Sequence, residues 1–195
     1  AGIRPAVRLA LQAAIVGVSF SLGGVVIDDL GNLFGYGPVR LGWLAWPFTI
    51  VCACALINAI NLMDGLDGLA AAITGGALLL TVIARLAMGH GNANEKMILL
   101  AVLLAFLVLN ARYPRHGRAS LFMGDSGSYF LGFALAYVVT RLGTGSEPVL
   151  PPIAVAWLVA LPIFNTVRVM MTRVRRGVSP FHADRDHLHY LLVDY

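Results

Sequence analysis

A series of long apolar runs limits the fold of this chain more than any other feature of its sequence. The runs cover roughly Pro5–Val26, Trp43–Ile60, Leu69–Met88, Met97–Asn110, Tyr129–Thr140 with its flanks, and Val149–Met171. A helix that crosses a bilayer needs about 20 mostly apolar residues. Within the bilayer only helices and closed barrels satisfy their own backbone hydrogen bonds. The sequence therefore predicts an all-α fold, a polytopic membrane helical bundle with about six transmembrane helices.

The composition argues against a soluble domain. Hydrophobic residues make up 58% of the chain and charged residues only 12%, whereas about a quarter of a soluble domain is charged. The mean hydropathy is +0.79. The net charge of +4 comes mostly from clustered arginines. This pattern favours anionic lipids and phosphates as partners, and we expect no nucleic-acid binding. Cys52 and Cys54 lie two residues apart in an apolar run, so we expect small core residues and no disulfide between them.

The basic residues predict an orientation in the membrane. If the N-terminal end is cytoplasmic, six crossings place residues 61–68, 111–128 and 172–195 inside and loops 27–42, 89–96 and 141–148 outside. Basic residues are then strongly enriched inside, as the positive-inside rule requires. The inside set is Arg4, Arg8, Arg112, Arg115, Arg118, Arg168, Arg173, Arg175, Arg176 and Arg185, and the outside set is Arg40, Arg85, Lys96 and Arg141. Most aspartates and histidines fall inside too, which indicates one site on that face.

The first polar motif, Asn58-Ala-Ile-Asn-Leu-Met-Asp-Gly-Leu-Asp-Gly-Leu, lies at the end of an apolar run. Asp64 and Asp67 are three residues apart, so they share one face of a helix. Gly65 and Gly68 leave room for a ligand near the backbone. Carboxylates at a membrane boundary are costly unless they are paired or used. The alternative is a helix end with solvated aspartates.

The second motif, Phe122-Met-Gly-Asp-Ser-Gly-Ser, is expected to open another helix, which continues into the next apolar run. A Gly-Asp-Ser-Gly turn exposes backbone N–H groups and offers the hard oxygen ligand of Asp125, a combination that suits a phosphate with Mg²⁺. The alternative is an ordinary helix N-cap.

The third motif, Ser179-Pro-Phe-His-Ala-Asp-Arg-Asp-His-Leu-His-Tyr, follows a basic run. His187 and His189 can reach a common ligand from an extended stretch, and Arg185 can hold a phosphate. The alternatives are a zinc site, for which a further Cys/His pair is missing, and a solvated loop. The pair Asp28-Asp29 falls in an outer loop, where we expect it to be solvated.

Together the strings NLMDGLDGLA, FMGDSGS and SPFHADRDHLHYLL resemble the signatures of the polyprenyl-phosphate N-acetylhexosamine-1-phosphate transferases, in order and with similar spacing. The resemblance covers essentially the whole chain, and the closing DRDHLHYLL looks more like the N-acetylglucosamine branch. It implies a bacterial inner-membrane enzyme whose active site faces the cytoplasm. Such an enzyme transfers a sugar-1-phosphate, here N-acetylglucosamine-1-phosphate, from a UDP-sugar to undecaprenyl phosphate. UMP is released, and the product starts the synthesis of cell-envelope polysaccharides such as lipopolysaccharide.

The resemblance also implies roles for individual residues. Asp125 would bind Mg²⁺, with Mn²⁺ as a substitute. Phe122 would lie against the uracil, with Asp67 and Asn110 as polar partners. Asp64 and Asn61 would line the catalytic cleft. The remaining residues, which would hold the sugar or the diphosphate, are Arg185, His187 and His189.

The sequence departs from the family pattern in places. An acidic pair on an earlier loop, written DDxxD, has no match, and Asn165 and Tyr190 stand where aspartate and histidine are usual. We therefore expect residues 1–195 to be a single transmembrane catalytic domain that is cut at both ends. Two alternatives are the phospho-MurNAc-pentapeptide transferase branch of the family and a membrane transporter. A homodimer is left open.

Overall fold

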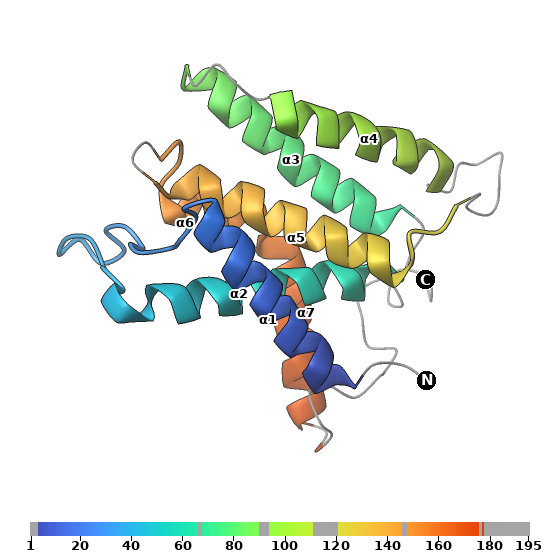
Figure 1. Ribbon diagram of the computed structural model, residues 1–195, viewed down its shortest axis with the longest axis horizontal. Helices are drawn as coiled ribbons and strands as arrows, with labels where there is room; N and C mark the ends of the chain where they lie inside the picture. Colours follow the sequence, from blue (N-terminus) through green and yellow to red (C-terminus); the bar gives the residue numbers. More distant parts are fainter. Residues whose placement is uncertain are drawn as a thin grey trace.

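The computed structural model describes residues 4–65, 68–89, 94–110, 121–145, 148–175 and 177. The described part is helical, apart from its loops and one isolated β-bridge between Asp29 and Arg40. Figure 1 shows how the helices are arranged. They are α1 (Pro5–Leu22), the 3₁₀ helix η1 (Gly42–Leu44), α2 (Ala45–Met63), α3 (Leu69–Ala87), α4 (Asn94–Asn110), α5 (Gly124–Gly143), α6 (Pro152–Leu158) and α7 (Ala160–Arg175).

The expectation of an all-α membrane fold is confirmed, but the expected count of about six spans is not. Within the described residues, α1, α3 and the η1–α2 unit are long and apolar enough to cross a membrane. α6 and α7 are separated by a 72° bend, and together they make a fourth span if the pair is counted as one element. The apolar part of α4, Lys96–Asn110, is shorter than a usual span. α5 has 20 residues, but its first turn is polar.

The bend between α6 and α7 divides what looks like one apolar run in the sequence. Pro162 lies in the first turn of α7, where its missing N–H costs little, whereas in a continuous helix it would remove a hydrogen bond to the carbonyl of Leu158. α6 ends at Leu158 instead, with Val159 as its C-cap residue, and the cap N–H groups bond back to the carbonyls of Ala156 and Trp157.

The centre of the fold is the contact between α2 and α5. α2 supplies many of the most deeply buried side chains, among them Ile60 and Met63. Gly132 of α5 allows the two backbones to approach closely, because a Cβ at this position would lie 2.8 Å from Cα of Ile57. Small residues serve membrane helix contacts in this way. α1 and α7 pack on α2, whereas α3 packs on the other side of α5 and carries α4 (Figure 1).

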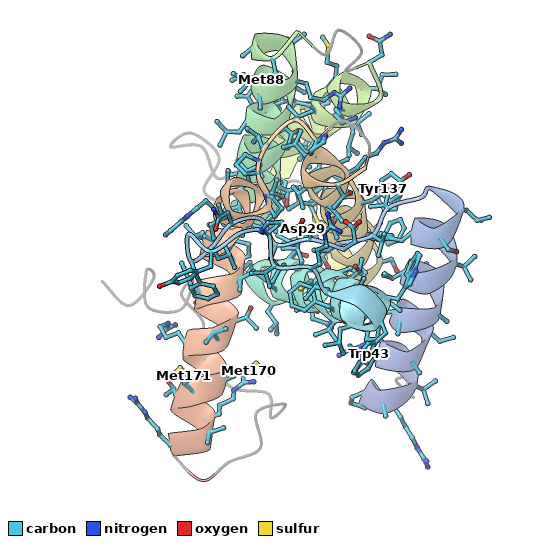
Figure 2. All side chains as sticks on the ribbon, turned by 90° about the vertical axis from the view of Figure 1, so that its left-hand side faces the viewer. Asp29, Trp43, Met88, Tyr137, Met170 and Met171 are labelled. Carbon is cyan, nitrogen blue, oxygen red and sulfur yellow. The ribbon has the colours of Figure 1, made fainter. Side chains whose placement is uncertain are left out.

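Large apolar side chains also cover much of the outer surface. Figure 2 shows them projecting outward from the helices, and Trp43 is 84% exposed. A soluble monomer rarely exposes so much contiguous apolar area, whereas a lipid environment accepts it. This surface is the expected outside of a membrane protein.

The two cysteines form no disulfide, as expected, whereas only one aspartate of the Asp28-Asp29 pair is fully exposed, since Asp29 is half-buried. Both cysteines are free thiols. Asp28 is exposed in the loop between α1 and α2. Asp29 accepts a hydrogen bond from the backbone N–H of Gly31 (2.6 Å) and so shapes that loop. The pair therefore lies within the loop between α1 and α2, where Asp29 also forms the β-bridge with Arg40.

Candidate functional site

Several polar residues gather where α2 and α4 end and α3 and α5 begin. Hydrogen bonds link these four helix ends across large distances in sequence, from Asn61 to Ser128 and from Gly68 to Asn110. Two of the three motifs found in the sequence, NLMDGLDGLA and FMGDSGS, therefore meet at one end of the bundle.

The best-defined contact joins Asn61 of α2 to the first turn of α5. The Asn61 amide Nδ2 donates to Oγ of Ser128 at 2.8 Å and lies 3.5 Å from Oδ1 of Asp125. The Ser128 hydroxyl also contacts the backbone carbonyl of Asp125 at 3.1 Å. Ser128 is fully buried whereas Asp125 is exposed. The buried end of this network thus holds an exposed carboxylate in place.

Asp125 is not the N-cap of its helix. α5 begins at Gly124, its N-cap residue is Met123, and no side chain caps the helix start. Gly124 has a φ of +66°, a conformation that suits glycine. The carboxylate lies in the first turn, where the helix dipole stabilises negative charge. The turn therefore presents Asp125 at the surface and does not use its side chain for capping.

Asp64 follows the same helix as Asn61, one turn further on. It is the C-cap residue of α2, and its backbone N–H bonds to the carbonyl of Asn61 at 3.3 Å. One turn of an α-helix rises about 5.4 Å, so Asp64 lies close to the Asn61–Asp125 contact. Asp67, the second carboxylate of the motif, lies outside the described residues.

Asn110 ties three of the helix ends together. It is only 3% exposed. Its Oδ1 accepts a hydrogen bond from the backbone N–H of Gly68 (2.7 Å), and its Nδ2 donates to the carbonyl of Leu121 (2.6 Å). Both ends of the amide are used for structure, and its contact with substrate stays a prediction. The next residue after Leu121 is Phe122, whose ring is 76% exposed and so open to a stacking partner.

Arg8, Tyr129 and Ser128 also belong to this end of the bundle, although the sequence patterns did not indicate them as site residues. The guanidinium carbon of Arg8 lies 5.4 Å from the centre of the Tyr129 ring, within the range of a cation–π contact. Tyr129 directly follows Ser128 on α5. The arrangement places a positive charge on α1 near the Asp125 turn. For Arg8, the only signal in the sequence was a basic residue in the first turns of an apolar helix.

The donor set fits a hard cation such as Mg²⁺. The exposed carboxylate of Asp125 offers a hard oxygen ligand at this end of the bundle, and Mg²⁺ usually takes one or two carboxylates and keeps several waters. In the described part of the chain no three His, Cys, Asp or Glu residues cluster around a common point. The third motif, with Arg185, His187 and His189, lies outside the described residues.

Helix ends that carry polar groups at one end of an apolar bundle define a membrane protein with an interfacial site. Residues 1–143 match the model of "Glycosyl transferase family 4", and the chain belongs to this family. It is 30% identical over 190 residues to the undecaprenyl-phosphate alpha-N-acetylglucosaminyl 1-phosphate transferase of Escherichia coli strain K12, covering 96% of this chain and 51% of that protein. The protein of the same name from Haemophilus influenzae is 31% identical over 198 residues, with 98% and 54% covered. The chain thus spans about half the length of these relatives.

Proposed function

We propose that the protein to which this chain belongs transfers N-acetylglucosamine-1-phosphate from its UDP-sugar to undecaprenyl phosphate and releases UMP. Family membership and the names of the relatives support the reaction class and the lipid acceptor. The observation that carries the proposal in this chain is the Asn61–Asp125 contact, which brings two family-like motifs to one site. The lipid product would start a cell-envelope polysaccharide such as lipopolysaccharide.

The reaction joins two anions. A phosphate oxygen of the lipid attacks the β-phosphorus of the UDP-sugar, the bond from that phosphorus to the bridging oxygen breaks, and UMP leaves with the bonding electrons. Positive charge must offset the repulsion between the substrates and the charge on the leaving group. Bound Mg²⁺ would supply that charge at the diphosphate.

Five residues of the candidate site have a task in this scheme. Asp125 would hold the metal ion, with Asn61 fixing the position of its carboxylate. Asp64 would face the same cleft from the end of α2. The guanidinium of Arg8 lies over the Tyr129 ring on the α1 side of the site and would attract the phosphate of a lipid that arrives through the bilayer. The exposed ring of Phe122 would receive the uracil.

The finer topology is part of the proposal. Six crossings, with the site on the cytoplasmic face of the bacterial inner membrane, would let the lipid stay in the bilayer while the UDP-sugar arrives from water. Cysteines introduced at positions 66 and 186 of the full-length protein should then react only with a reagent applied from the cytoplasmic side. Labelling from outside at both positions would contradict the orientation.

The activity is tested with full-length protein, Mg²⁺, undecaprenyl phosphate and a panel of UDP-sugars. We expect UMP release that needs the lipid, the metal ion and UDP-N-acetylglucosamine together. Release with UDP-MurNAc-pentapeptide alone would favour the other branch of the family. Absence of UMP release with every donor would contradict the proposed enzyme.

A further inference from the structure

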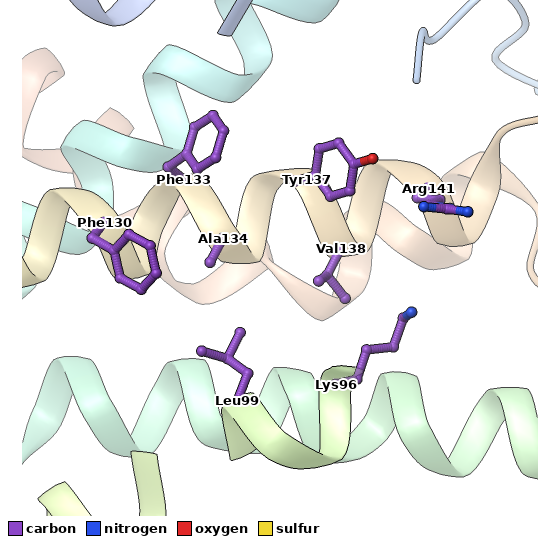
Figure 3. Close-up of a pocket in the computed structure, with 8 residues that line it drawn as sticks. All are labelled: Lys96, Leu99, Phe130, Phe133, Ala134, Tyr137, Val138 and Arg141. Carbon is purple, nitrogen blue, oxygen red and sulfur yellow. The ribbon is translucent and has the colours of Figure 1, made fainter. Parts of the chain in front are cut away.

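α4 and α5 leave an open groove between them. Both helices pack on α3, and direct contact between α4 and α5 is slight. The groove has a volume of about 220 Å³ (Figure 3). Its lining consists of six apolar or aromatic residues and two basic ones: Leu99, Phe130, Phe133, Ala134, Tyr137, Val138, Lys96 and Arg141.

The apolar lining forms one stripe along α5. Phe130, Ala134 and Val138 are spaced four residues apart, so they lie on the same face of the helix. Leu99 of α4 faces this stripe across the groove (Figure 3). The ring of Phe130 is 63% exposed although it lines the groove. The groove is smaller than a usual small-molecule pocket of about 300–1,000 Å³, and its apolar stripe offers contact for a single acyl chain.

The two basic residues lie at the same end of the groove. Lys96 is in the first turn of α4, Arg141 is in the last turn of α5, and Figure 3 shows Lys96 extending toward α5 at the end marked by Arg141. Asp125 is at the other end of α5. Arg141 lies 16 positions after Asp125 on the same helix, which corresponds to about 24 Å. The basic end of the groove is therefore distinct from the candidate active site, and the stripe runs from it toward Phe130.

We propose that this groove binds an anionic glycerophospholipid of the leaflet opposite the active site. The phosphate would lie between Lys96 and Arg141, and one acyl chain would follow the stripe from Val138 toward Phe130. Long basic side chains at a membrane boundary keep their stems in apolar surroundings and their charges near the headgroups. A phosphate between two cations gains charge-assisted hydrogen bonds. The headgroup of a zwitterionic lipid carries a cation beside its phosphate, and the two basic residues would repel that cation. They should therefore favour an anionic headgroup.

The test measures lipid binding to the full-length protein by native mass spectrometry, with phosphatidylglycerol and phosphatidylcholine as probes. We expect the unsubstituted protein to favour phosphatidylglycerol, and Lys96→Gln with Arg141→Gln to weaken that binding about tenfold. Arg40→Gln is the matched control, because Arg40 is an exposed arginine in the loop between α1 and α2 and does not line the groove. An unchanged preference in the double variant, or no preference in the unsubstituted protein, would overturn the proposal.

A second measurement locates the acyl chain and does not depend on the stability of the charge variants. Phe130→Trp adds an indole at the far end of the stripe. Its additional fluorescence should be quenched more by phosphatidylglycerol brominated on its acyl chains than by the corresponding phosphatidylcholine. Equal quenching by the two lipids would show ordinary bilayer contact. No quenching by either would show that another part of the full-length chain covers the groove, and both results contradict the proposal.

Discussion

The side-chain amide of Asn61 lies 3.5 Å from the carboxylate of Asp125, across the contact between α2 and α5. It is fixed by a shorter hydrogen bond to the buried hydroxyl of Ser128. The position of the proposed metal ligand thus depends on a neighbour that is 64 residues away in sequence.

Asn61→Ala should therefore lower the rate of transfer about tenfold or more and raise the Mg²⁺ concentration needed for half-maximal rate. The variant keeps the carboxylate but removes the group that orients it. Displacement of a catalytic group by about 1 Å can lower a reaction rate by roughly 100-fold. Asn58→Ala is the matched control, since Asn58 bonds Gln12 on α1 at 2.8 Å, one turn away from the site. Equal Mg²⁺ profiles in the two variants would mean that Asn61 acts only in helix packing.

Arg8→Gln should raise the KM for the lipid phosphate more than the KM for the UDP-sugar. The guanidinium lies over Tyr129 on the α1 side of the site, where loss of its charge removes attraction for one anion. Arg8→Lys should recover part of the effect, because lysine keeps the charge but not the planar contact with the ring. Arg4 is exposed one turn earlier, and Arg4→Gln should leave both KM values nearly unchanged. Equal effects on the two substrates would argue against a lipid-specific role.

Gly132→Ala should destabilise the fold by about 1–3 kcal/mol, because the new methyl group would overlap the backbone of Ile57 at 2.8 Å. Thermal unfolding in detergent measures the change. Gly76→Ala in α3 is the control: no heavy atom lies within 4 Å of its added Cβ, and alanine is the better helix former. If the two variants unfold at the same temperature, the close contact between α2 and α5 is not important for stability.

Asn110→Ala should cost about 1–3 kcal/mol of stability, because it leaves the buried backbone N–H of Gly68 and the carbonyl of Leu121 without their partner. Asn110→Asp keeps the acceptor for Gly68 but places a carboxylate oxygen against the carbonyl of Leu121 at a buried position, so it should be at least as destabilised as Asn110→Ala. Loss of stability in both variants would establish the structural role of the Asn110 amide. A fully stable Asn110→Ala with a raised KM for the UDP-sugar would instead favour direct binding.

The apolar runs predicted the helices well, because a helix of about 20 apolar residues has few alternatives in a membrane. The exception was the run Val149–Met171, where Pro162 marks the break between α6 and α7. The Gly-Asp-Ser-Gly segment was expected to open the next helix, and α5 does begin there, at Gly124.

The candidate site was predicted in part. The motifs indicated Asn61 and Asp125, and the structure places their side chains 3.5 Å apart. Sequence patterns carry no information on which helix face meets which, so the contacts of Arg8 with Tyr129 and of Asn61 with Ser128 were not foreseen. Asn110 was expected beside the substrate, but its side chain is buried and bonded to backbone groups at both ends. The roles of all these residues in catalysis stay predictions.

The most direct test of the account is the rate of UMP release by full-length Asp125→Asn at saturating Mg²⁺. Asparagine keeps the size of the side chain and loses the charge that would hold the metal ion, so we expect a loss of about 100-fold or more with normal membrane insertion. Asp28→Asn removes an exposed aspartate from the loop between α1 and α2 and should retain full activity. Near-normal transfer by Asp125→Asn with an unchanged Mg²⁺ requirement would contradict the assignment of Asp125 as the metal ligand.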